Sequence, residues 1–265
     1  MRGPALLLAC LIAAAIVAPV IAPYPPDRLD LAHRREAPSI AHLFGTDDLG
    51  RDVLARVLFG ARVSLAVGLL SAAVAAASGV AVGGVAGYAG GAVDAILMRL
   101  TDAMLAVPRL PLLMIAASIL EPSVVLLVLM IGLAGWMETA RVVRAEFLTL
   151  RTRGFVENAR ASGAGHARLI GAHLLPNAAP AVIVSLTLAV ARGILLESAL
   201  SYFGVGVRPP QASWGNMLYQ AQTTLATEPW LAFAPGLFIL MTTMAVNAVG
   251  GALEREPAGR MTREA

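Results

Sequence analysis

Long runs of apolar residues, separated by short polar segments, dominate the pattern along this chain. A helix rises about 1.5 Å per residue, so roughly 20 apolar residues cross a hydrocarbon layer about 30 Å thick. The pattern therefore predicts about six membrane-spanning helices. They are expected at Pro4–Ala22, Val63–Tyr88, Thr101–Leu120, Ser123–Thr139, Ala179–Val205 and Trp230–Gly250.

Composition agrees with this pattern. Hydrophobic residues make up 58% of the 265 positions and charged residues 14%, and the mean hydropathy is +0.74. Soluble globular chains are about half apolar and about a quarter charged. The predicted fold class is therefore an all-α integral membrane protein, and a net charge of +3 gives no reason to expect a nucleic-acid partner.

Arginine placement predicts how the helices cross the membrane. Arginines gather between the fourth and fifth apolar runs and again after the last run. Because short loops rich in arginine face the cytoplasm, both segments are predicted to be cytoplasmic, and six spans then place the N-terminus there too. The segment 23–62, which is then outside, carries arginines of its own, and this argues against the assignment. The arginines that favour it are Arg151, Arg153, Arg160, Arg168, Arg255, Arg260 and Arg263.

A second helical pattern lies within the segment 23–62. Charged and apolar residues alternate at helical spacing over Leu49–Leu58, and Asp47 or Asp48 is placed to cap the N-terminus. We therefore predict an amphipathic helix on the outer membrane surface.

Small residues recur at four-residue steps in the second apolar run, at Ala75, Gly79, Gly83 and Gly87. Such a stripe lets another helix approach closely, which favours helix association in lipid. A loose alanine- and glycine-rich composition is the alternative explanation.

Motifs for catalysis, cofactors or metals are missing from the sequence. There is no GxxxxGK[ST] loop, no HExxH and no serine in a GxSxG setting, and the chain has one cysteine. His166 and His173 would share a helix face, but no carboxylate or cysteine completes a ligand set, so a solvated face is the preferred interpretation. No catalytic residue, metal site or cofactor is predicted, and the protein is not expected to be an enzyme.

Three charged residues inside predicted spans are the candidates for a role in transport, namely Arg109, Arg192 and Glu197. Each costs about 2.5 to 3.5 kcal/mol on insertion scales, so such residues usually face a bundle interior or an aqueous pathway. Arg109 could instead extend toward the headgroups. Glu197 is too short to do so and is expected to be an internal structural or pathway residue. An ion-coupled secondary carrier or channel that uses these three residues is the alternative function.

A compact polar segment, Glu157–Asn177, interrupts the apolar pattern with the sequence ENARASGAGHARLIGAHLLPN. Gly163 is expected to break a first helix, and Pro176 to start the next span, where its missing N–H needs no partner. The segment therefore predicts a helix, a bend and a second helix across the cytoplasmic face, which is the form of a docking element.

This segment resembles the EAA loop of bacterial ABC importer permeases, whose pattern is E-A-A, three residues, a glycine and an I/L-x-L-P-like ending. Asn158 replaces the usual alanine, and Leu174 stands where isoleucine is common. The matching residues are Glu157, Ala159, Gly163, Leu175 and Pro176.

Two further stretches are similar to signatures of the dipeptide/oligopeptide/nickel permease group, specifically its second, shorter subunit. They are HLFGTDDLGRDVLARVLFGARVSLAVGL at His42–Leu69 and ALSYFGVGVRPPQASWGNML at Ala199–Leu218. With GYAGGAVDAILMR before the third span, the resemblance covers nearly the whole chain. Two positions depart from the pattern: Arg109 stands where a small or apolar residue is common, and Gly251 where an aspartate often follows the glycine.

The resemblance implies a type I ABC importer permease in the bacterial cytoplasmic (inner) membrane. Its implied partners are a homologous permease subunit in a heterodimer, two cytoplasmic ATP-binding subunits, an extracytoplasmic substrate-binding protein and membrane lipid. The polar loop would insert into a cleft of an ATPase, with Gly163 setting the angle of the coupling helix. The residues expected to couple to the ATPase are Glu157, Ala159, Arg160, Gly163, Arg168, Leu175 and Pro176.

The resemblance leaves open whether the substrate is a dipeptide, a longer peptide, a nickel chelate or a related small molecule.

The predicted spans and loops divide the chain into four parts. The expected divisions are a first transmembrane helix at 1–22, an extracytoplasmic loop with the amphipathic helix at 23–62, the importer transmembrane domain at 63–252 with its cytoplasmic coupling loop at 142–178, and a cytoplasmic tail at 253–265.

Overall fold

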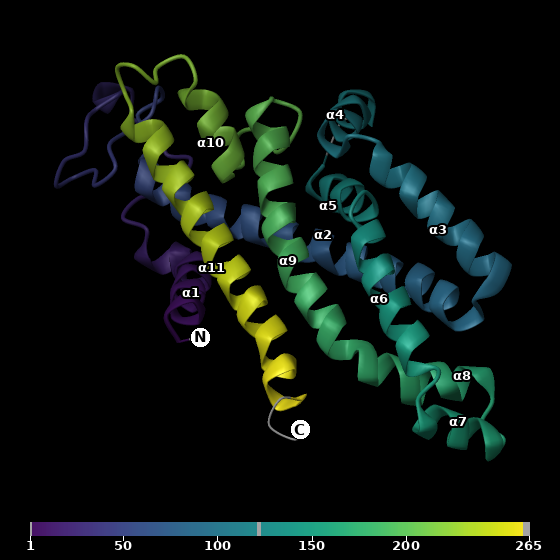
Figure 1. The fold of residues 1–265 in the computed structure, drawn as a ribbon. Helices are drawn as coiled ribbons and strands as arrows, with labels where there is room; N and C mark the ends of the chain where they lie inside the picture. Colours follow the sequence, from purple (N-terminus) through teal and green to yellow (C-terminus); the bar gives the residue numbers. More distant parts are fainter. Residues whose placement is uncertain (1, 121–122, 262–265) are drawn as a thin grey trace.

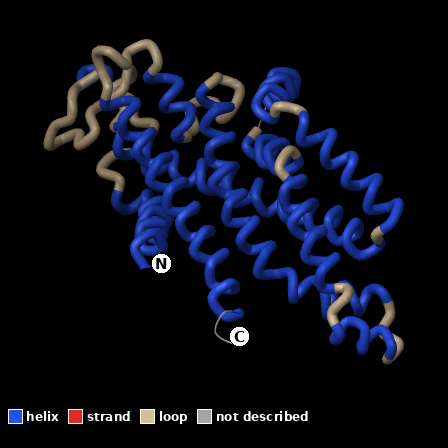
Figure 2. Tube along the Cα trace, in the orientation of Figure 1, coloured by secondary structure: helices blue, strands red, loops and turns tan. Residues whose placement is uncertain are grey.

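The computed structural model describes residues 2–120 and 123–261, and over these residues the chain is built of helices and loops without a β-strand (Figure 2). The elements in chain order (Figure 1) are α1 Arg2–Ile21, the 3₁₀-helix η1 Leu31–His33, α2 Val53–Ala89, α3 Gly91–Ala106, α4 Arg109–Leu120, α5 Val124–Leu133, α6 Trp136–Leu150, α7 Gly154–Ala161, α8 His166–Arg168, the π-helix η2 Leu169–Leu174, α9 Leu175–Tyr202, α10 Trp214–Ala221 and α11 Trp230–Met261.

The predicted all-α membrane fold is confirmed. Within the described residues, four continuous helices are long and apolar enough to cross a membrane, and two bent pairs raise the number to as many as six. The four are α1, α2, the rod from α8 to α9, and α11. The bent pairs are α3 with α4 and α5 with α6. The third and fourth spans were predicted as single straight helices, and that part of the prediction is wrong.

The first bend lies inside the predicted span Thr101–Leu120. Helices α3 and α4 meet at 81°. The cause is Pro108, because a proline disfavours the helical conformation of the residue before it. Val107 is accordingly extended, with φ −81° and ψ 125°, and α4 begins at Arg109.

The second bend lies inside the predicted span Ser123–Thr139, where α5 and α6 meet at 44°. The N–H of Gly135 donates to the carbonyl of Gly132 at 3.0 Å, three residues back instead of four. This tightened turn interrupts the α-helical hydrogen-bond ladder. A new helix, α6, then begins at Trp136.

The predicted amphipathic surface helix over Leu49–Leu58 is wrong. Helix α2 begins at Val53, capped by the side chain of Asp52, which accepts from the N–H of Ala55 at 2.8 Å. Val53 and Val57 are buried in a cluster with residues of α10 and α11. The periodic apolar residues therefore form a packing face of a long helix, because residues 23–52 fold back over its start.

The glycine stripe of α2 does bring a neighbouring helix close. A Cβ on Gly83 would lie 2.2 Å from the carbonyl oxygen of Ala140 in α6, and Gly79 and Gly87 face the same helix at similar separations. The stripe is therefore a packing surface between α2 and α6, as the spacing predicts.

Replacing Gly83 with alanine is expected to lower the melting temperature of the protein in detergent. Alanine is the better helix former by up to about 1 kcal/mol, but backbone that must move aside costs typically about 1 to 3 kcal/mol. Gly251→Ala in α11 is the matched control, since a Cβ there meets nothing within 4 Å. An unchanged melting temperature for Gly83→Ala would contradict the close packing.

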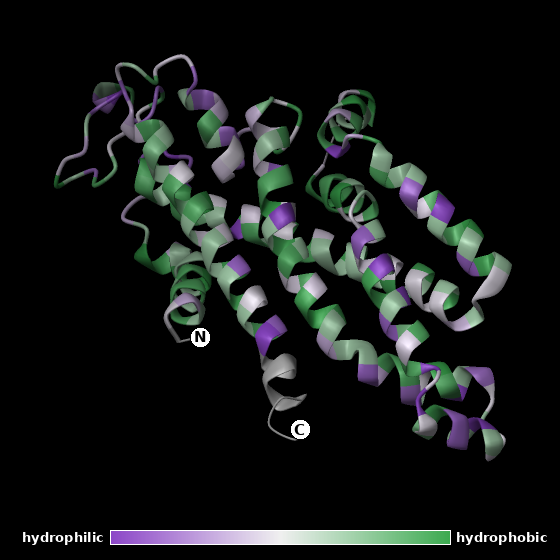
Figure 3. Ribbon diagram, viewed as in Figure 1, coloured by the Kyte–Doolittle hydropathy of each residue, from purple (hydrophilic) through white to green (hydrophobic). Residues whose placement is uncertain are grey.

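The two ends of the molecule differ. The start of α1, the end of α11 and helices α7 and α8 lie at one end, whereas α10 and the residues between α1 and α2 lie at the other (Figure 1). Apolar residues fill the long helices between these ends, and polar residues gather around α7 and in the segment after α1 (Figure 3). Both described chain ends therefore lie on the side of the predicted coupling loop.

Candidate functional site

The polar turn between α6 and α9, here named the α7 corner (residues 154–176), begins with helix α7. Gly163 has φ +82°. Its N–H donates to the carbonyl of Arg160 at 3.0 Å, and that of Ala164 donates to Ala159 at 3.0 Å. This pair of bonds is a Schellman motif, which needs a residue in the left-handed region. The predicted break at Gly163 is confirmed.

The second half of the α7 corner differs from the prediction. From His166 the chain runs through α8 and the π-helix into α9 as one rod, so no second helix crosses the face separately. Pro176 lies in the first turn of α9, directly after the π-helix, where the hydrogen-bond pattern of the helix changes. It therefore follows the π-helix without ending the rod.

The inner side of the α7 corner is packed tightly. Val156, Leu169 and Leu174 are buried against Val143 and Phe147 of α6. This cluster joins the corner to α6 and α9.

The outer side of the α7 corner carries the charges. Arg160 is exposed, Leu175 is at the limit of exposure at 36%, and Ala159 instead faces inward and is half-buried. Phe155 in α7 is an exposed apolar residue that sequence analysis missed; an aromatic residue within the polar segment after α6 was the available signal. The remaining predicted coupling residues, all exposed, are Glu157, Gly163, Arg168 and Pro176.

Two of the three charged pathway candidates meet at a carboxylate that sequence analysis missed. Glu138 accepts from Arg109 Nη2 at 2.8 Å and also pairs with Nη1 of Arg192. We name these three residues the arginine–glutamate cluster; they come from α6, α4 and α9. Glu138 lies within the predicted fourth span, and a charge at that position was the signal for it.

A cavity of about 610 Å³ adjoins the arginine–glutamate cluster. Glu138 and Arg192 line one part of it, and their side chains are 34% and 40% exposed. The other lining residues come from α6, α9 and the end of α11; they are Val142, Glu146, Asn177, Pro180, Ala181, Val184, Ser185, Leu188 and Glu254.

The third candidate, Glu197, lies apart from this cavity and is completely buried. Ser64 of α2 and Ser201 each donate to its carboxylate at 2.8 Å. The hydroxyl of Ser64 also accepts from the N–H of Trp214 at 3.2 Å. Glu197 therefore links α2, α9 and α10, and its surroundings are those of a structural residue.

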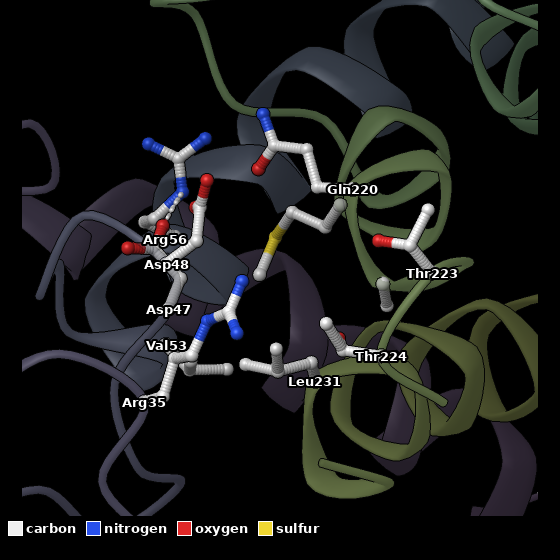
Figure 4. A pocket seen from close by; sticks show the side chains of 11 residues that line it. Arg35, Asp47, Asp48, Val53, Arg56, Gln220, Thr223, Thr224 and Leu231 are labelled. Carbon is white, nitrogen blue, oxygen red and sulfur yellow. Dashed lines mark ion pairs between the residues drawn. The ribbon is translucent and has the colours of Figure 1, made fainter. Parts of the chain in front are cut away.

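An ion-pair network holds the segment between α1 and α2. Asp47 accepts from Arg51 Nε at 2.6 Å and lies 3.7 Å from Arg56 Nε, and all three side chains are less than a tenth exposed. Arg51 also donates to Gln220 of α10 at 3.4 Å. The network borders a cavity of only about 60 Å³ (Figure 4), too small for a peptide.

Residues 79–258, which include the α7 corner and the arginine–glutamate cluster, match the family profile described as the binding-protein-dependent transport system inner membrane component. The chain belongs to this family. It is a multi-pass permease subunit of an ABC importer, as its sequence predicts. The comparisons give no support to the alternative of an ion-coupled carrier.

Relatives of this permease have related names. A putative peptide permease protein of Brucella suis biovar 1 (strain 1330) is 40% identical over 249 residues, 93% of this chain and 82% of the relative. The oligopeptide transport system permease protein OppC of Bacillus subtilis (strain 168) is 36% identical over 248 residues, 94% and 81% of the two chains. A putative peptide transport system permease protein of the same Brucella suis strain is 37% identical over 247 residues, 93% and 83%.

Proposed function

We propose that this permease forms part of the translocation pathway for di- or oligopeptides, or a related small solute. The names of its relatives support the substrate class. The cavity beside the arginine–glutamate cluster supports a polar solute, because charges inside a membrane protein usually face an aqueous pathway.

The proposed assembly contains a homologous permease subunit, two cytoplasmic ATP-binding subunits and an extracytoplasmic substrate-binding protein. The α7 corner is the proposed contact with an ATP-binding subunit, and this puts both chain termini in the cytoplasm. The carrying observation is that Glu157, Arg160 and Arg168 are exposed on a tightly anchored corner and make no ion pair within the described residues. Such charges are available to a protein partner.

Coupling follows from the way the corner is built. ATP-driven movement of an ATPase would push the α7 corner, whose buried residues pack on α6, while the rod from His166 to Tyr202 leads into α9. Helices α6 and α9 carry Glu138 and Arg192. A push on the corner would therefore reach the arginine–glutamate cluster and shift the balance between two arrangements of the pathway.

The test is uptake of a labelled peptide by proteoliposomes that contain the complete importer. ATP is enclosed in the lumen, and the loaded binding protein is added outside. We expect accumulation of the peptide only when both are present. If a nickel chelate is accumulated and no peptide is, the proposed substrate class is wrong.

A further inference from the structure

The arginine–glutamate cluster has more positive than negative charge. We infer that Arg109 and Arg192 form a binding site for a carboxylate of the transported solute, such as the C-terminal carboxylate of a peptide. This inference rests on the proposed function and names the chemical group that the pathway recognises.

The charge balance of the cluster is the first argument. Two guanidinium groups share the single carboxylate of Glu138, and in the described part of the chain neither arginine pairs with another acid. A guanidinium has five N–H donors, and Glu138 accepts one from each arginine. Glu146 and Glu254 also line the adjoining cavity, so the excess positive charge is local to the two guanidinium groups. Their remaining donors can bind a second carboxylate, the group that arginine binds best.

The broken helices are the second argument. Arg109 is the first residue of α4, directly after the 81° bend, and Glu138 lies in the first turn of α6, after the 44° bend. Non-helical backbone at membrane depth is tolerated where it is buried in protein or lines an aqueous cavity. Discontinuous helices in transporters present their N-terminal ends to anionic groups of the substrate. Arg109 and Glu138 thus place the ends of both bends at the cluster, where an anionic group of the substrate is expected.

Access to the cluster is the third argument. The adjoining cavity of about 610 Å³ is lined along α9 from Asn177 to Arg192, about 22 Å along the helix axis. Its volume is within the usual range for small-molecule sites, about 300 to 1,000 Å³. A solute in this cavity can therefore reach the half-exposed guanidinium of Arg192. Arg109 does not line the cavity, and it adjoins Arg192 through the shared carboxylate of Glu138.

The same geometry provides a route for release. A bound solute carboxylate competes with Glu138 for Arg192, and the two residues lie on α6 and α9, the helices that the α7 corner moves. A movement that tightens the pair between Glu138 and Arg192 weakens the contact with the solute. Glu138 is thus a positioning residue that holds the two guanidinium groups together and, when it moves closer to Arg192, weakens the contact between Arg192 and the solute.

The test compares two forms of one labelled peptide, with a free C-terminal carboxylate and with a C-terminal amide. We expect Arg192→Gln to lower the uptake rate of the carboxylate form roughly tenfold, the effect of losing one hydrogen bond between charged groups, and to leave the amide form nearly unchanged. The wild type and Arg192→Gln are supplied by the same binding protein. Any preference of that protein for one peptide form therefore cancels when the carboxylate-to-amide uptake ratios of the two are compared.

The matched control is Arg144→Gln, also in a membrane helix. Arg144 pairs with Asp94 of α3 at 2.5 and 2.6 Å and does not line the cavity. Its removal is expected to change the uptake of both peptide forms by the same factor. An equal loss for both forms in Arg192→Gln would overturn the inference and make the cluster purely structural. Absence of peptide uptake by the wild type would instead refute a peptide as the proposed substrate.

A second measurement removes the need for the binding protein. In a Cys10→Ala background of the assembled importer, Leu188→Cys introduces a single thiol into this permease's cavity lining. The free-carboxylate peptide is expected to slow labelling of this thiol several-fold more than the amide, and Arg192→Gln is expected to abolish the difference. Equal protection by both peptides would contradict recognition of the carboxylate.

Discussion

The Gly163→Asp variant is expected to insert and assemble but to lose roughly nine-tenths or more of its ATP-driven uptake. Most residues other than glycine cost about 1 to 2 kcal/mol in the left-handed region and aspartate costs less, and Gly163 has φ +82°. A Cβ there meets nothing within 4 Å, so space is not the obstacle. The strain would disturb the turn after α7, and the new carboxylate would change the charge of the proposed docking surface.

The measurement pairs uptake with ATP hydrolysis in proteoliposomes. Uptake is expected to fall while the ATPase subunits still hydrolyse ATP. Gly165→Asp is the control, because it adds the same charge two residues away, at the N-cap of α8, where the backbone is extended and aspartate is favoured. Equal loss in both variants would assign the effect to charge alone. Normal uptake in Gly163→Asp would refute docking at the α7 corner.

The apolar runs predicted the spans well because membrane helices require about 20 apolar residues whatever their tertiary contacts. The bends were missed because hydropathy measures composition and not direction. Pro108 was a local signal for the first bend, since proline restricts the residue before it. The turn at Gly135 had no comparable signal, because glycine is common in membrane helices.

The segment between α1 and α2 illustrates a different limit. An apolar face over Val53 and Val57 fits a helix lying on a membrane surface and equally one packed against protein. Only the fold-back of residues 23–52 and the contacts with α10 and α11 decide between them. Those contacts join parts of the chain more than a hundred residues apart, as the bond from Trp214 to the carbonyl of Val57 demonstrates.

The candidate site could be predicted only in part, because some of its features are local in the sequence and others depend on contacts between distant segments. The polar α7 corner has a local sequence pattern, in which Gly163 ends α7 and Pro176 lies in the first turn of α9. Its position in the chain and its first bend could therefore be predicted. The inward face of Ala159 could not, because it depends on packing against α6. Glu138 gained its significance only when the fold brought Arg109 and Arg192 to it from two other helices.

Removal of the buried carboxylate in Glu197→Ala is expected to have the largest effect on stability. The change leaves the hydroxyls of Ser64 and Ser201 without their acceptor and opens a cavity between α2, α9 and α10. Unpairing buried polar groups and creating a cavity together cost on the order of 3 kcal/mol or more. For a chain of this size that corresponds to a fall in melting temperature of about 6 to 12 °C.

Thermal melting in detergent measures this loss, and the variant Glu197→Gln tests its cause. Glutamine keeps the shape and one carbonyl acceptor, so it is expected to melt closer to the wild type than alanine does. Glu254→Ala, which removes an exposed carboxylate in α11, is expected to leave the melting temperature nearly unchanged. A residue that only holds helices together lowers transport by lowering stability. If Glu197→Ala melted like the wild type but abolished peptide uptake, Glu197 would therefore act in the pathway, and its structural assignment would be wrong.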